Sequence, residues 1–209
     1  MKFREPGELN EKEIQWKTLE QELEKTIDGR GKRVDEKIKF PVIALQANDF
    51  ATTASCEGHK DRGLPWPWID VESALELKLM HDARFNELKE KAWAAFKKTG
   101  DMTESEKEEY AKLQRALMEE NEKEHNRLLG VLTEFYDIAS EASQVGVRLG
   151  IWKRPANQSR LQPADIPERI KGVDVQKIWS DEEKEKRLRL YREEFDRFGS
   201  FLKQKFLSK

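Results

Sequence analysis

Apolar residues recur at helical spacing near the N-terminus of the chain, and Asn10 with Glu13 forms a capping-box pattern just before them. The residues that share this predicted helical face are Trp16, Leu19, Leu23 and Ile27. Two glycines within residues 28–31 favour a turn that ends the helix.

The stretch from Val34 to Asn48 allows two interpretations. Its apolar residues keep helical spacing, but Pro41 lacks the N–H group that a helix interior requires. We expect a helix that is kinked at Pro41 or begins just before it, with Asn48 near its end. The alternative is a strand over residues 40–45.

Three short segments have strand character. Residues 51–56 are rich in threonine, and residues 68–71 follow a loop punctuated by glycine and proline. Apolar residues alternate with glycine and arginine from Val145 to Ile151, which is strand spacing. Residues 155–167 lack such periodicity, and we expect a loop there.

Apolar residues again recur at helical spacing in two long stretches. One lies between the second and third predicted strands, and the other follows residue 180. One helix is predicted near residues 77–98, and Thr103 with Glu106 forms a second capping box before a long helix that reaches Ala139. The two should form a helical hairpin. Ser180 with Glu183 caps a final helix, whose apolar seam requires a helical partner: Leu188, Tyr191, Phe195, Phe198 and Leu202.

The predicted fold class is α+β, mainly helical, with a small antiparallel sheet of about three strands, packed helices and an inserted long helical hairpin. We expect a single domain over residues 1–209. Its sheet-containing core comprises residues 33–75 and 144–152, the hairpin insertion is 76–143, and the C-terminal helix is 179–207.

Composition narrows the function classes. The 209 residues are 38% charged, yet the formal net charge is only −2, which argues against blanket neutralisation of nucleic-acid phosphates. The single cysteine excludes an intrachain disulfide and a multi-cysteine zinc site. Because the sequence contains no signal-peptide core and no apolar run of membrane-spanning length, we expect a cytoplasmic protein with no membrane partner.

The segment Thr53-Ala54-Ser55-Cys56-Glu57-Gly58-His59 gathers several reactive groups. Strand alternation places Thr53, Ser55 and Glu57 on one face, and Gly58 permits a turn that brings His59 back over the strand end. We predict Cys56 as nucleophile or contact residue, His59 as acid/base and Glu57 as a third catalytic candidate. The alternative is an inert cysteine packed on a half-buried strand.

Residues downstream suggest how a ligand would be held. Thr53, Ser55 and Gly58 are predicted ligand contacts, and Trp66 or Trp68 could form a wall for a planar group, unless both cap the core. Arg62 and Arg148 are predicted anion ligands, with Lys60, Arg154 and Arg160 nearby in this interpretation.

Three polar residues interrupt apolar helix faces: His81, Asn121 and His125. If the hairpin turns near Asp101, His81 faces Asn121. We interpret these residues as buried hydrogen-bonding groups rather than a two-histidine metal site, because no acidic ligand is suitably spaced. No metal site is predicted, and the sequence identifies no cofactor.

The run Thr53-x-Ser55-Cys56-Glu57-Gly58-His59, followed by Pro67-Trp68, resembles a motif in a group of uncharacterised bacterial proteins. More distantly, Thr52-Thr53-x-Ser55-Cys56-x-Gly58 is similar to the signature of the wybutosine-synthesis methyltransferase family, which acts on tRNA using S-adenosylmethionine. That family usually has serine and arginine where this chain has Ala54 and His59. The resemblance implies a shared strand-turn element.

The sequence therefore favours a binding site for a small anionic or nucleotide-like ligand at this segment, with catalysis as an extension of that hypothesis. One alternative is a helical scaffold that binds a protein partner through its hairpin or C-terminal helix. Another is a protein related to RNA modification.

Overall fold

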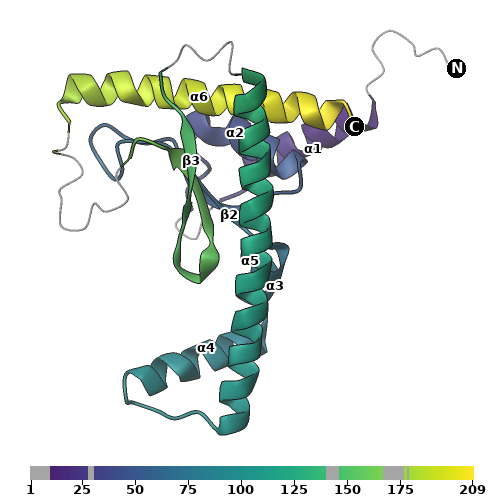
Figure 1. The fold of residues 1–209 in the computed structure, drawn as a ribbon, viewed down its shortest axis with the longest axis vertical. Helices are drawn as coiled ribbons and strands as arrows, with labels where there is room; N and C mark the ends of the chain where they lie inside the picture. Colours follow the sequence, from purple (N-terminus) through teal and green to yellow (C-terminus); the bar gives the residue numbers. More distant parts are fainter. Residues whose placement is uncertain (1–9, 28–30, 140–145, 167–176, 178) are drawn as a thin grey trace, which may run out of the picture.

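The computed structural model describes residues 10–27, 31–139, 146–166, 177 and 179–209. Its helices are α1 (Glu11–Lys25), α2 (Lys39–Ala47), α3 (Ala74–Met80), α4 (Ala83–Phe96), α5 (Glu104–Ala139) and α6 (Asp181–Leu207), with short 3₁₀ turns η1 (Glu36–Ile38) and η2 (Pro155–Asn157) (Figure 1). The strands are β1 (Ala51–Cys56), β2 (Trp68–Glu72), β3 (Leu149–Lys153) and β4 (Ser159–Pro163). The predicted α+β, mainly helical fold is confirmed.

The sheet has four strands in the order β1-β2-β4-β3, and every neighbouring pair is antiparallel. The prediction of a loop over residues 155–167 was therefore wrong, because β4 lies inside it, between β2 and β3. Leu161 is its fully buried residue, opposite Ile69 on β2. Cross-strand pairing makes this strand, since Asp70 on β2 is the register partner of Arg160.

The strand predicted from residue 145 begins later. β3 starts at Leu149, and Val145 lies outside the described residues. Gly146 has φ +74°, so the chain turns before the strand. One ladder-like hydrogen bond extends the pairing, as the Ala164 N–H donates to the Arg148 carbonyl at 2.7 Å.

The N-terminal predictions hold with one change. Asn10 and Glu13 form the expected reciprocal capping box at the start of α1, but Ile27 lies beyond the helix and bridges to Arg33. Pro41 is the third residue of α2, where its missing N–H has no partner to lose. The helix thus begins just before Pro41, and the alternative strand over residues 40–45 was wrong.

Three helices form an arm that projects from the sheet. In Figure 1, α5 extends well past the sheet, with α3 beside it and α4 diverging from it. The single helix predicted near residues 77–98 was wrong, because the chain breaks at His81 and Asp82. Asp82 caps α4 by accepting from the Phe85 N–H at 2.7 Å, which competes with continuing α3.

The main core lies where α6 crosses α2 and the sheet. Phe195, Phe198 and Leu202 of the predicted α6 seam are fully buried in one cluster with residues of α2 and β2. A Cβ at Gly199 would lie 2.9 Å from the Phe40 ring, so this position keeps the two helices in close approach. The seam thus packs on the chain's own helices.

Within the part of the chain that the structure describes, no helix combines the length and the apolar character needed to cross a bilayer.

Candidate functional site

The turn after β1 is fixed by close packing against α6. Gly58 is buried and has φ +74°, a conformation that favours glycine. A Cβ at this position would lie 2.6 Å from Leu188 Cδ2 on α6 and 2.6 Å from the carbonyl carbon of Trp66. Glycine is therefore required both by the backbone angle and by the space available.

Arg192 of α6 holds the same turn by its guanidinium group. Its Nε donates to the Glu57 carbonyl at 2.9 Å, and its Nη2 donates to the Gly58 carbonyl at 2.7 Å. The Glu57 carboxylate lies 3.6 Å from Arg192 Nη2 and accepts from the Lys37 N–H at 3.0 Å. Glu57, predicted as catalytic, thus joins η1, the turn and α6.

Three metal- or proton-binding side chains converge at the base of this turn. One donor atom each from Asp35, Cys56 and His59 lies within 4.8 Å of the other two, and all three residues are half-buried. His59 Nε2 is 3.5 Å from Asp35 Oδ2. The Glu57 N–H donates to the same Asp35 oxygen at 3.2 Å, and the Gly58 N–H donates to Cys56 Sγ at 3.4 Å.

The environment of Cys56 disfavours a free thiolate. Burial raises the pKa of the Cys56 thiol, and the negative charges of Asp35 and Glu57 raise it further, while the hydrogen bond from Gly58 lowers it. A cysteine nucleophile requires the opposite shift. This environment therefore gives little support to Cys56 as a nucleophile acting alone.

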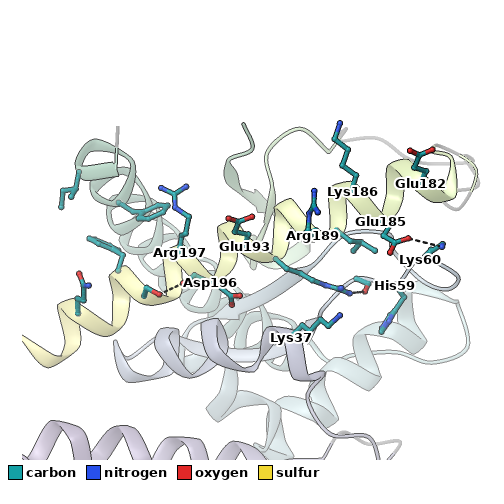
Figure 2. A pocket seen from close by; sticks show the side chains of 18 residues that line it. Lys37, His59, Lys60, Glu182, Glu185, Lys186, Arg189, Glu193, Asp196 and Arg197 are labelled. Carbon is teal, nitrogen blue, oxygen red and sulfur yellow. Dashed lines mark hydrogen bonds and ion pairs between the residues drawn. The ribbon is translucent and has the colours of Figure 1, made fainter. Parts of the chain in front are cut away.

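A surface groove of about 1440 Å³ runs along α6 from this turn. Figure 2 shows Lys37, His59 and Lys60 along one side of α6, and Lys186, Arg189 and Glu193 extending on the other. The Lys60 ammonium lies 3.5 Å from the Glu185 carboxylate. Six lysine and arginine residues but only four aspartate and glutamate residues line the groove.

Among the residues that the structure describes, Gly58 and His59 are the predicted site residues that line the groove. Thr53 lies half-buried on β1, where it lowers the pKa of the Glu72 carboxyl, while burial raises that pKa. Ser55 is half-buried on the same strand, and Arg62 is exposed in the following loop.

The predicted aromatic wall does not form beside the groove. Trp66 is only 2% exposed and packs edge-on against Trp179, with ring centroids 6.0 Å apart. Trp68 lies beneath the Arg160 guanidinium, 3.8 Å from the ring centroid. Both tryptophans belong to the packed interior or its edge, because the Pro-Trp loop folds inward beneath α6.

Two arginines of the predicted anion-binding group form hydrogen bonds with a carboxylate of the sheet. Arg160 forms two hydrogen bonds with the Asp70 carboxylate, at 2.7 and 2.8 Å, and Arg154 adds a third at 2.9 Å. Arg148 is exposed and lies over the Tyr136 ring. Since β4 places Arg160 opposite Asp70, Arg160 and Arg154 share that carboxylate within the sheet.

The polar residues of the arm are buried hydrogen-bonding groups, as expected for two of the three. Asn121 accepts from the Ser73 N–H at 3.0 Å and donates to the Glu76 carboxylate at 2.7 Å. His125 Nδ1 lies 2.9 Å from Ser159 Oγ, and burial lowers the pKa of its imidazole. The predicted pairing of His81 with Asn121 was wrong, because His81 is exposed where α3 ends.

Two residues of the site have no local sequence signal. Asp35 precedes η1 and Arg192 lies in the middle of α6, and both reach the turn only through packing of distant segments. For Arg192, the sequence offered only one indirect hint: it is a charged residue on the same side of the helix as the apolar seam residues Leu188 and Tyr191.

No protein-family model matches the chain, and no curated protein and no solved structure is significantly similar to it. The resemblance of the Ser-Cys-Glu-Gly-His segment to other proteins therefore stays a prediction.

Proposed function

We propose that the protein binds a small anionic ligand at the end of the α6 groove formed by Lys37, His59 and Lys60. The observation that carries this proposal is the pair of exposed lysines at this end of the groove, Lys37 and Lys60, beside a turn that Arg192 holds in place. Two of the six basic residues that line the groove, Arg192 and Arg197, are already paired with Glu57 and Glu194.

The basic residues at this end are available to a ligand. Lys37 is exposed, while its backbone N–H is fixed by the hydrogen bond to Glu57. Lys60 and Glu185 form an exposed pair, and such pairs contribute little to stability, so Lys60 can exchange its partner for a ligand. An anion bound here would contact lysines whose backbone is held in place by the turn at Glu57, not lysines on a loose surface segment.

The position of the tryptophans narrows the ligand class. A nucleotide-like ligand was expected because Trp66 or Trp68 could stack on a base. Since both lie away from the groove, the proposal rests on the anionic group alone, and a phosphate or polycarboxylate is the class that the lysines favour.

Calorimetric titration of the full chain with pyrophosphate tests this proposal. Binding should weaken at least about tenfold in Lys37→Gln/Lys60→Gln, and it should weaken with added salt. Lys123→Gln is the matched control, because Lys123 lies exposed on α5 and does not line the groove. Equal affinities in the double variant and the control would contradict the proposal.

The arm supports a second candidate function, binding of a protein partner. Trp93 and Phe96 of α4 are 57% and 77% exposed and stack with ring centroids 5.7 Å apart. Large exposed aromatic pairs are typical of protein interfaces. The test is whether a protein captured by the wild-type chain is lost with Trp93→Ser/Phe96→Ser and kept with Lys37→Gln/Lys60→Gln.

A further inference from the structure

The cluster of Asp35, Cys56 and His59 has the composition of a transition-metal site. Its donors are a carboxylate oxygen, a sulfur and an imidazole nitrogen, all within 4.8 Å of one another. Zn²⁺ accepts this mixture of ligands, whereas Mg²⁺ and Ca²⁺ prefer oxygen donors alone.

The spacing of the donors is close to that of a bound ion. In a tetrahedral zinc site with bonds of about 2.0–2.3 Å, neighbouring donors lie about 3.3–3.8 Å apart. His59 Nε2 and Asp35 Oδ2 are already 3.5 Å apart. No separation in the cluster exceeds 4.8 Å, so the donors need to approach one another by at most about 1 Å to reach this spacing.

The backbone around the cluster is also arranged in a way that suits metal binding. Cys56 and His59 are three positions apart, and the left-handed Gly58 brings them to one side of the turn. The Gly58 N–H donates to Cys56 Sγ, and the Glu57 N–H donates to Asp35 Oδ2. Such outer hydrogen bonds orient the ligands of metal sites.

The turn is also rigid. The His59 N–H donates to the Leu64 carbonyl at 3.0 Å, and Arg192 binds the carbonyls of Glu57 and Gly58. Because the ligand-bearing loop is ordered in this way, a metal ion would meet donors that are already placed.

We propose that Asp35, Cys56 and His59 bind one Zn²⁺ ion, with a fourth coordination position open to the α6 groove. His59 lines the groove, which gives an ion at this cluster a route to solvent. Three protein ligands with one open position is the arrangement of catalytic rather than structural zinc sites. The ion and the anion proposed above share only His59, since Lys37 and Lys60 are not ligands of the ion.

Titration of the chelator-treated full chain with Co²⁺, followed by displacement with Zn²⁺, tests the proposal. We expect one equivalent to bind, with a sulfur-to-cobalt charge-transfer band and visible bands of four-coordinate intensity, both abolished by Zn²⁺. Cys56→Ser should remove the charge-transfer band, and His59→Ala should weaken Zn²⁺ binding at least about 100-fold. His81→Ala is the control, because His81 is an exposed histidine that follows the last residue of α3, outside the cluster.

Asp35→Asn keeps the test decisive if Cys56→Ser does not fold, because it preserves size while removing the carboxylate charge. It should keep the charge-transfer band and weaken binding at least about tenfold. Absence of stoichiometric Co²⁺ binding would overturn the proposal, and so would binding that is unchanged in His59→Ala. Pyrophosphate binding is tested on the chelator-treated chain through Lys37→Gln/Lys60→Gln, so the two proposals can fail separately.

Discussion

His59 Nε2 lies 3.5 Å from Asp35 Oδ2, although α2 and β1 both lie between the two residues in the chain. The contact exists because β1 returns the chain to the start of η1, and because Arg192 and Gly58 hold the following turn there. The candidate site is thus a product of tertiary packing at the edge of the sheet, and its predicted behaviour follows from that packing.

Gly58→Ala should strongly destabilise the fold. The left-handed conformation costs a side chain about 1–2 kcal/mol, and the contact at 2.6 Å with Leu188 adds about 1–3 kcal/mol. We expect a total loss of about 2–5 kcal/mol in the free energy of unfolding, measured by urea denaturation.

Gly63→Ala separates the two causes. Gly63 also has positive φ, +60°, but nothing lies within 4 Å of its Cβ position. This variant should lose only the conformational part, about 1–2 kcal/mol. Equal losses for Gly58→Ala and Gly63→Ala would show that packing against α6 does not constrain the turn.

Arg192→Lys should destabilise the protein while conserving its charge. The guanidinium group donates to two carbonyls at once through two different nitrogen atoms. The lysine side chain is shorter and carries a single nitrogen, so it does not reproduce both hydrogen bonds. The expected loss is about 1.5–3 kcal/mol in the free energy of unfolding. Arg189→Lys, an exposed position on the same helix, should change it by less than about 0.5 kcal/mol; a comparable loss there would contradict the role of Arg192.

Asn121→Ala should weaken the packing of α5 against the start of α3. Asn121 is 1% exposed, and its removal leaves the Ser73 N–H and the Glu76 carboxylate without this partner. We expect a loss of about 2–4 kcal/mol by chemical denaturation. The matched control is Asn126→Ala, exposed on the same helix, with a change within about 0.5 kcal/mol.

The stability of the protein should fall as the pH drops below the ordinary histidine pKa of 6.5, and His125 should account for part of that fall. Burial lowers the pKa of His125 in the folded state, so the unfolded chain takes up a proton first. The contribution of neutral His125 is therefore present above pH 6.5 and is lost as the pH falls through the lowered value.

His125→Asn should flatten the dependence of unfolding free energy on pH between about pH 7 and 5, although it also loses the contact with Ser159. His81→Asn serves as control, since His81 is exposed and lacks that partner. A slope unchanged in His125→Asn would exclude His125 as the source.

Local signals predicted the helices well. The capping boxes at Asn10 and Thr103 involve residues only three positions apart, and both form as expected. The break between α3 and α4 was not predicted, although Asp82 and the Phe85 N–H that it caps are only three positions apart.

The sheet was harder to predict because β4 depends on its neighbours. Ser159–Pro163 contains a single large apolar residue, and its polar side chains are satisfied by residues far away in the chain, such as Asp70 and His125. No window of the sequence carries that information.

The candidate site likewise combines features that follow from a local segment with features that depend on tertiary packing. The turn at Gly58, which brings His59 back towards Cys56 at the strand end, was predicted from a short segment. Asp35 and Arg192 joined them only through the packing of η1 and α6, so the sequence predicted reactive groups without the carboxylate that completes the metal-binding set.

The most direct measurement of the central claim is anomalous X-ray scattering from crystals grown with Zn²⁺, recorded on both sides of the zinc absorption edge. The account predicts one zinc peak about 2.0–2.3 Å from Cys56 Sγ, His59 Nε2 and an Asp35 carboxylate oxygen. A peak at any other position, or no peak at these three residues, would contradict it.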